Sequence, residues 1–241
     1  MTERGVSDVV GFVLIFALII TSVGLVYTAG LTSLQDARDA QRLSNAETAF
    51  DAIDTTANDV VYRGAPSRTI GIGLAGATLG PGDDVRITVN GSNGRVNTTV
   101  TPLIYRYDDS RFVYVGGVVI RSDGENAVLL DDPGIRIAPG ANRTLVPVIN
   151  TIARGGTVGG RTRARVSFAS RDPSMRDVTM LDGPVNVTVT TPRAEAWSQA
   201  FADVEACANA SPPTNETATA RCTLKDESVV VSRTNVTMRV V

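Results

Sequence analysis

The sequence has no histidine, a single lysine and only two cysteines among its 241 residues. Histidine is the commonest general base near neutral pH and the commonest metal ligand, so its absence removes the usual Ser-His-Asp and zinc arrangements. Two thiols without histidine are also a poor metal site. The composition therefore predicts a protein that is not an enzyme and that holds no metal ion and no cofactor.

Aromatic residues are scarce, at 5%, and the formal net charge is only -2. A nucleic-acid-binding surface would need clustered basic residues with interleaved aromatics, and the arginines here are scattered along the chain. Paired acids occur at Asp83-Asp84, Asp108-Asp109 and Asp131-Asp132, in segments that read as turns, where solvated carboxylates are usual. The sequence predicts no nucleic-acid partner.

What the sequence does contain is one long apolar run near its beginning. Val9 to Gln35 carries no charge, and Val9 to Val26 includes only Thr21 and Ser22 as polar side chains, besides two glycines. Eighteen helical residues span about 27 Å, close to the thickness of a bilayer's hydrocarbon core. A buried core helix and a cleaved secretory signal are the alternatives, but the possible cleavage site at Thr28 to Gly30 is poor. The run favours a retained membrane helix.

The flanking charges suggest an orientation. Arg4 precedes the apolar run, and Asp36 is the first charge after it. The positive-inside tendency therefore predicts a cytoplasmic N-terminus, with everything after about Gly30 outside the cell.

The residues before the helix carry a family resemblance. Glu3 to Gly11 reads ERGVSDVVG, and this charged pair, small residue, Val-Ser and apolar helix resembles the processing site of haloarchaeal type IV prepilins. The resemblance implies a leader of residues 1–5 that a prepilin peptidase removes between Gly5 and Val6. It also implies a helix over 6–30 that serves as membrane anchor and filament core, contacting lipid and other pilin-like subunits. Many such pilins have proline where this chain has Asp8, and bacterial pilins have glutamate where it has Val10.

Asp8 suggests one hypothesis of its own. In a medium of low dielectric constant, its carboxylate could pair with the free amine of a mature Val6, in the same chain or in a neighbouring subunit. Alternatively, Asp8 lies in the headgroup layer or caps the start of the helix. Unchanged surface display and assembly in Asp8→Ala would argue against the pairing.

The helical pattern continues past the apolar run. Residues 31–63 form an amphipathic spine, whose apolar stripe consists of Leu31, Leu34, Ala37, Ala40, Leu43, Ala46, Phe50, Ile53, Ala57 and Val60. Gly64 is the expected stop, so a helix from about Val9 to Tyr62 would measure on the order of 80 Å. We expect the stripe to pack on the chain's own head; a stalk or coiled coil is the alternative.

Residues 64–241 predict a β-rich head, which makes the fold class α+β. Apolar residues now recur at every second position, as in a β-strand. Turn signals such as Gly80 to Asp83 and Asn93-Gly94 separate the strands. This pattern favours a mainly antiparallel, sandwich-like head with one short helix near Thr191 to Ala206, where Thr191 could act as N-cap. The alternating positions are Val85-Ile87-Val89, Val113-Val115, Val128-Leu130, Ile135-Ile137, Val166-Phe168, Val178-Met180, Val185-Val187-Val189 and Val236-Met238-Val240.

Gly71 to Gly76 satisfies the G-x-G-x-x-G pattern of dinucleotide sites. Such a site needs a helix to begin at the glycines so that its amides face the pyrophosphate, and turn residues follow here instead. The glycines are instead expected to let strands pack close to the long helix.

The head also carries signals of an exported surface. Cys207 and Cys222 flank a polar loop and are predicted to form a disulfide that contributes about 3 kcal/mol. Asn-x-Ser/Thr motifs are frequent for the composition and are candidate N-glycosylation sites, although threonine-rich strands also generate them by chance. They lie at Asn90, Asn97, Asn142, Asn186, Asn209, Asn215 and Asn235.

Together these patterns predict a single-pass protein of the cell membrane with an extracellular head. The favoured function is that of a pilin-like subunit, or a minor component of a surface filament, acting in adhesion or assembly. A non-polymerising anchored binding protein is the main alternative. An anchored ectoenzyme is a more distant one, because the two carboxylates of a glycosidase need not be neighbours in sequence.

Overall fold

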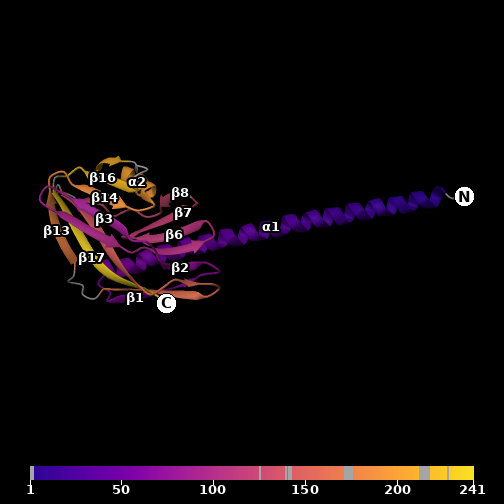
Figure 1. Ribbon diagram of the computed structural model, residues 1–241, viewed down its shortest axis with the longest axis horizontal. Helices are drawn as coiled ribbons and strands as arrows, with labels where there is room; N and C mark the ends of the chain where they lie inside the picture. Colours follow the sequence, from indigo (N-terminus) through magenta and orange to yellow (C-terminus); the bar gives the residue numbers. More distant parts are fainter. Residues whose placement is uncertain are drawn as a thin grey trace. The chain divides into compact units, whose positions relative to one another are not determined.

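A computed structural model describes residues 3–241 except 125, 139, 141–142, 171–175, 212–217 and 227. Contacts divide the chain into two compact units, Met1–Asn45 and Ala46–Val241. The second unit therefore includes the last turns of the long helix as well as the predicted head. The fold is α+β, as predicted: a long apolar N-terminal helix, many antiparallel strands and a second short helix (Figure 1).

The long helix α1 runs without interruption from Glu3 to Tyr62. It begins six residues before the predicted Val9, because no glycine pair or proline separates the first residues from the apolar run. Its end is as predicted. Gly64 adopts a left-handed backbone with φ of 71°, and the Ala65 N–H donates to the Asp59 carbonyl at 3.1 Å. A residue without a Cβ takes that conformation at little cost, which stops the helix there.

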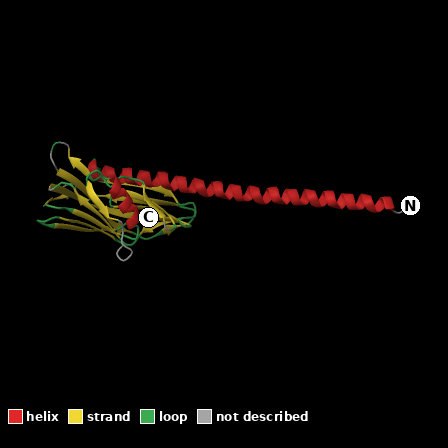
Figure 2. Cartoon of the chain, turned by 90° about the horizontal axis from the view of Figure 1, so that it is seen from above, coloured by secondary structure: helices red, strands yellow, loops and turns green. Residues whose placement is uncertain are grey.

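The second unit contains three β-sheets and the short helix α2 (Ala194–Asp203), which Figure 2 shows in red against the yellow strands. The first sheet has the order β1 (Ser67–Gly73), β12 (Arg163–Ala169), β17 (Ser228–Val240), β10 (Arg143–Arg154) and β9 (Arg136–Ala138), with β13 (Arg176–Asp182) also on β17. The second is β11 (Val158–Gly159), β2 (Thr78–Pro81), β5 (Leu103–Tyr107), β6 (Ser110–Val115), β7 (Val118–Asp123) and β8 (Asn126–Leu129). The third is β15 (Cys207–Ser211), β16 (Thr219–Leu224), β14 (Asn186–Thr190), β3 (Val85–Asn90) and β4 (Arg95–Val100).

One strand pair departs from the antiparallel pattern. β10 and β17 are parallel, in register from Thr144 opposite Val229 to Arg154 opposite Arg239. The other strand pairs among the described residues are antiparallel. Parallel neighbours cannot be joined by a tight turn, so the chain between β10 and β17 builds β11 to β16 and α2 before it returns.

The unit has two apolar cores, and β17 contributes to both. Val229 and Val231 belong to a core that the third sheet and α2 share. Val236 and Met238 are equally buried but lie outside that cluster. Since successive strand residues point to opposite faces, the change from odd to even positions means that β17 turns its other face inward midway.

The last turns of α1 are the centre of the second core. Phe50 is fully buried, with its ring centroid 5.8 Å from that of Phe112 and 6.4 Å from that of Tyr105, both on the second sheet. Ile53 and Ala57 on the same stripe are also fully buried. The prediction that the stripe packs on the chain's own head is therefore confirmed from Ala46 onward.

The short helix starts later than predicted. Thr191 was expected as the N-cap, but α2 begins at Ala194 after a turn, and Arg193 occupies the cap position without a capping side chain. The Thr191 hydroxyl instead accepts a hydrogen bond from the Arg193 backbone N–H at 3.3 Å within the turn. Trp197 and Phe201 face the core as predicted, with their ring centroids 5.7 Å apart.

Two smaller predictions have opposite outcomes. Cys207 and Cys222 form the predicted disulfide, with Cα atoms 5.6 Å apart on the neighbouring strands β15 and β16. The role suggested for the glycines of the G-x-G-x-x-G stretch is wrong. A Cβ added at Gly71 would meet Arg163 of β12, and one at Gly73 or Gly76 would meet nothing within 4 Å, so none of the three permits close contact with α1.

Candidate functional site: the uncovered apolar helix

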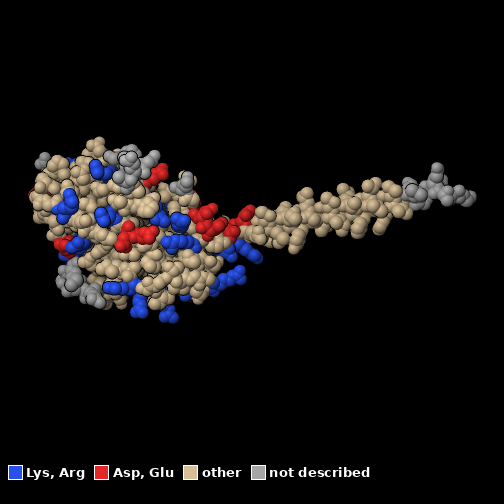
Figure 3. Space-filling view, in the orientation of Figure 1, with Lys and Arg blue, Asp and Glu red and all other residues tan. Residues whose placement is uncertain are grey.

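The first part of α1 exposes apolar side chains on every side. Phe12, Leu18 and Val26 are 69%, 68% and 69% exposed, and the intervening large apolar residues from Val9 to Tyr27 are all more than half exposed. No residue of the apolar window is buried, and Figure 3 shows this part of the helix as a continuous uncharged surface. A helix that is apolar all round needs an apolar environment, which this unit of the chain does not itself provide.

Three hydroxyl side chains of this segment donate hydrogen bonds to backbone carbonyls of the preceding helical turn. The hydroxyls of Thr21 and Ser22 donate to the carbonyls of Ala17 and Leu18, both at 2.8 Å. Thr28 donates to the Gly24 carbonyl at 3.1 Å in the same way. A hydroxyl bonded to the preceding turn needs no water, so these three side chains can lie in an apolar environment without an unsatisfied donor.

This geometry defines what the segment can do. By length and composition it can cross a membrane once, and the same surface could equally be covered by apolar helices of other chains. Helix α1 includes the predicted processing residues Gly5 and Val6 as well as Asp8. Their side chains fall outside the described part of the structure, so the cleavage and the pairing of Asp8 stay predictions.

The candidate glycosylation sites are dispersed over the head. Asn97 on β4 and Asn209 on β15 are exposed. Asn90, Asn186 and Asn235 are half-buried, and each carboxamide oxygen accepts a hydrogen bond from another side chain. Asn142 and Asn215 lie outside the described residues. Exposure therefore favours Asn97 and Asn209 as the accessible acceptors, and their occupancy stays a prediction.

A second feature was missed by the sequence analysis: an acidic cleft beside the end of α1. The cleft has a volume of about 280 Å³. Its polar lining consists of Asp54, Asn58 and Tyr62 from α1 together with Asp131 and Asp132 from the segment after β8. Asp131 and Asp132 were read as solvated turn acids, but Asp131 is partly buried here. No sequence signal links Asp54 to Asp131, because the two are brought together only by folding.

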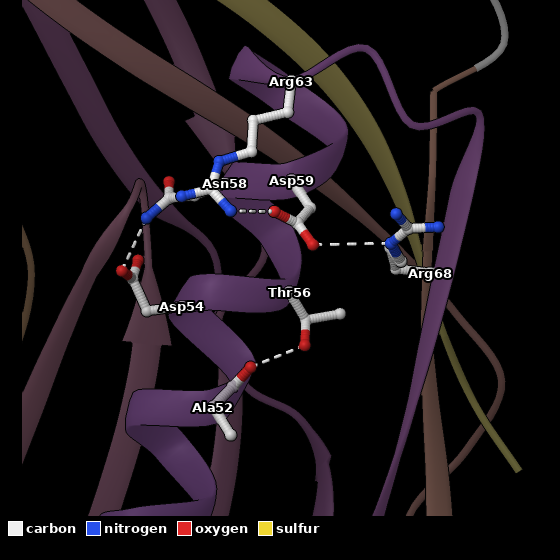
Figure 4. A network of polar contacts seen from close by, with 7 residues as sticks. All are labelled: Ala52, Asp54, Thr56, Asn58, Asp59, Arg63 and Arg68. Carbon is white, nitrogen blue, oxygen red and sulfur yellow. Dashed lines mark hydrogen bonds and ion pairs between the residues drawn. The ribbon is translucent and has the colours of Figure 1, made fainter.

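The carboxylates in the cleft differ in their pKa values. Burial, and then the charge of Asp131, raise the pKa of Asp54 from 3.8 to about 6. Its Oδ2 accepts from the Asn58 amide at 2.7 Å, shown in Figure 4, whereas its buried Oδ1 has no partner among the described residues. Burial also raises the pKa of Asp131. Burial acts on Asp132 in the same direction, but hydrogen bonds from Arg136 and the Gly134 N–H outweigh it and hold its pKa below the usual value.

The raised pKa of Asp54 predicts a specific pH dependence. Between about pH 4 and 6 the folded chain holds a proton that the unfolded chain releases, so stability falls as the pH rises through this window. Asp54→Asn should therefore unfold at a higher denaturant concentration than wild type at pH 7.5. Because Asp54 is partly exposed, the gain is on the order of 1 kcal/mol. The gain should vanish at pH 4.

Urea unfolding at both pH values measures this effect. Asp36→Asn, an exposed carboxylate of the same helix, is the matched control and should show no pH-dependent gain. A gain for Asp54→Asn that is equal at pH 4 and pH 7.5 would contradict the assignment.

The chemistry of the cleft is limited by what surrounds it. No group of three or more histidine, cysteine, aspartate or glutamate side chains suited to a metal ion occurs within the described ranges. The apolar helix is the candidate functional site.

The fold and this site define a class: an α+β protein with a long N-terminal apolar helix and a disulfide-containing β-rich head. The chain belongs to a family of unknown function (DUF7289), which it matches over residues 4–239. Comparison with curated proteins and with solved structures gave no match.

Proposed function

We propose that this chain is a membrane-anchored, pilin-like surface protein whose helix also serves as a subunit contact in a type IV pilus-like filament. The observation that carries the proposal is the apolar segment from Val9 to Val26, in which no side chain is buried. Leaving this surface in water would be very unfavourable, since each buried CH₂ group contributes about 0.8 kcal/mol. Lipid before assembly and neighbouring helices afterwards would both cover it.

Three further observations support the same proposal. The resemblance of Glu3 to Gly11 to a prepilin processing site explains why a membrane helix should follow so closely on Arg4. The helix from Glu3 to Tyr62 contains both the apolar segment and, from Ala46 onward, residues that are buried in the head. The Cys207–Cys222 disulfide fits an oxidising compartment, which supports a head outside the cytoplasm.

The N-terminus of the mature protein tests the proposal. The chain is recovered from cell envelopes and from sheared surface filaments, and its intact mass and N-terminal sequence are measured. We expect both measurements to show a chain that begins at Val6. A mature chain that begins beyond residue 30 would contradict both the anchor and the filament role. A chain that begins at Val6 in the envelope but is missing from filaments would contradict the filament role alone.

A further inference from the structure

Four arginines that are far apart in the sequence lie on one face of the first sheet. Arg163 and Arg165 are two residues apart on β12, so their side chains leave the sheet on the same side. Arg239 of β17 lies opposite Ser167 of β12, which continues the same alternation. Arg154 of β10 is the direct neighbour of Arg239 in the parallel register. All four arginines are exposed, and we call them the arginine face.

The opposite face of the same strands is covered by the second core. Val166 and Phe168 of β12 and Met238 of β17 are fully buried. The ring of Phe168 lies 5.8 Å from that of Tyr114 on the second sheet, centroid to centroid. The arginine face is therefore the outer, solvent-exposed face of a sheet whose inner face is already packed.

The arginine face carries an excess of positive charge. Its strands β1, β10, β12 and β17 contain no acidic residue, and neither does the segment 155–162, which adds an exposed Arg161. Among the residues described, none of the four arginines forms an ion pair. In Figure 3, the side of the head on which Figure 1 places β1 and the C-terminus shows basic side chains and no acidic ones.

The acidic groups of the first sheet leave this excess in place. Strand β13 carries the acidic residues of the sheet, and it pairs with β17 only from Ser228 to Thr234. One of them, Asp177, is already paired with Arg233 at 2.6 Å. The α-carboxylate of Val241, whose backbone pairs with that of Arg165, offsets one charge of the face.

Repulsion within the arginine face favours an anionic partner. Arg154 and Arg239 are direct cross-strand neighbours, and like charges in such positions destabilise a sheet. Strands lie about 4.8 Å apart and residues rise about 3.4 Å along a strand, so the four positions cover roughly 14 by 10 Å. Each guanidinium group can form paired hydrogen bonds with a carboxylate or a sulfate. A partner with several anionic groups can therefore contact several arginines at once.

The residues around the arginines are small and polar. Thr69 of β1 lies opposite Ser167 of β12, and Thr237 precedes Arg239 by two residues on β17. On β1, a Cβ added at Gly73 would meet nothing within 4 Å, so the surface there is open. Guanidinium and hydroxyl groups thus alternate over an open surface, which suits an extended polymer that carries both acidic and hydroxyl groups.

Two other anionic partners fit this face less well. Single-stranded nucleic acid stacks its bases on aromatic side chains, but β1, β10 and β17 contain none and Phe168 of β12 faces the core. Surfaces that bind a bilayer usually add large apolar or aromatic side chains that insert into it. Here Ile152 and Val241 are the exposed large apolar residues beside the arginines.

We propose that the arginine face binds a polysaccharide that carries carboxylate or sulfate groups. The acidic groups pair with the guanidinium groups and offset their repulsion, while sugar hydroxyls contact the threonine and serine side chains between them. The choice of a polysaccharide rests on the proposed function, which places the head outside the cell. Binding of an anionic polymer to the head does not depend on the apolar helix or on cleavage before Val6, so the two proposals fail separately.

Titration with defined polymers tests the proposal. Polygalacturonate, dextran sulfate and neutral dextran are titrated into the full-length protein in a non-ionic detergent, and binding is measured by calorimetry. Because the formal net charge of the chain is -2, the protein as a whole does not attract a polyanion. We expect saturable binding of the two charged polymers that weakens as sodium chloride is raised, and no binding of dextran. No binding of either charged polymer, or equal binding of dextran, would overturn the proposal.

Variants locate the binding surface. Arg165→Gln/Arg239→Gln should weaken polygalacturonate binding about tenfold or more, and without polymer it should unfold at an equal or higher temperature than wild type, because repulsion is reduced. Arg154→Gln should weaken binding severalfold and keeps the test valid if the double variant does not fold.

The matched control removes the same charge from another sheet. Arg86→Gln/Arg221→Gln changes two exposed arginines on β3 and β16 of the third sheet. We expect it to bind polygalacturonate like wild type. Equal weakening by this control and by Arg165→Gln/Arg239→Gln would show that binding follows net charge alone, and would overturn the proposal.

The same variants distinguish the polysaccharide from other partners. Polymer binding to the folded head should raise the unfolding temperature of wild type, followed by the fluorescence of Trp197, the only tryptophan, and should not raise that of the double variant. Tighter binding of oligothymidylate than of either polysaccharide would assign the face to nucleic acid instead. A rise in unfolding temperature with phosphatidylglycerol-containing micelles, without one on adding polysaccharide, would assign it to lipid headgroups. Either result would overturn the proposal.

Discussion

Placing two arginines in the apolar segment, as in Leu14→Arg/Leu18→Arg, should release the protein from the membrane fraction. Both leucines are well exposed on the apolar helix, at 65% and 68%, near the middle of the run from Val9 to Val26. A leucine-to-arginine change near the centre of a membrane helix costs about 3 kcal/mol, so the pair costs about 6 kcal/mol. That is comparable with the favourable transfer energy of the whole segment. Carbonate extraction of membranes, followed by quantification of the pellet, measures the effect.

The matched control uses the same substitutions beyond Val26, nearer the first charged residues of the helix. Leu31→Arg/Leu34→Arg introduces equal charge at exposed positions of the same helix, where arginine side chains can reach the aqueous interface. We expect this variant to stay in the membrane pellet. Retention of the Leu14→Arg/Leu18→Arg variant in the pellet would show that the apolar segment is not the anchor.

Truncating Phe50 should cause a large loss of stability in the head. Phe50 is fully buried, and its ring contacts those of Phe112 and Tyr105. Phe50→Ala would leave a cavity in a core that the helix shares with the second sheet, at a cost of about 3–5 kcal/mol. Guanidinium unfolding in detergent, followed by Trp197 fluorescence, measures the change in the free energy of unfolding.

Leu34→Ala is the control for this prediction. Leu34 belongs to the same predicted stripe but is 58% exposed, so its truncation should change the free energy of unfolding by less than about 0.5 kcal/mol. A loss below 1 kcal/mol for Phe50→Ala would mean that the last turns of α1 are not part of the core of the head.

The apolar stripe of α1 is exposed before about residue 45 and buried after it. Leu31 and Leu34 follow the same three-and-four spacing as Phe50 and Ile53, yet only the latter pair is buried. Periodicity predicts which face of a helix is apolar, but it does not say where along the helix a partner begins. The boundary of the compact unit at Ala46 is set by the sheets, whose strands are distant in sequence.

Sequence by itself determined the features that depend on neighbouring residues. A single apolar run surrounded by lipid can satisfy its backbone only as a helix, Gly64 stops that helix, and alternation of apolar residues marks the strands. The Cys207–Cys222 pair followed from there being only two thiols in a chain predicted to be exported.

Tertiary structure alone decided what depends on residues far apart in the chain. The parallel pairing of β10 with β17 and the meeting of Asp54 with Asp131 each join segments that have no local relation. In the second case Asp131, which reads as an ordinary solvated residue, becomes partly buried and acquires a like-charged neighbour. Such effects arise from long-range packing, because desolvation and charge repulsion depend on distance in space and not on distance along the chain.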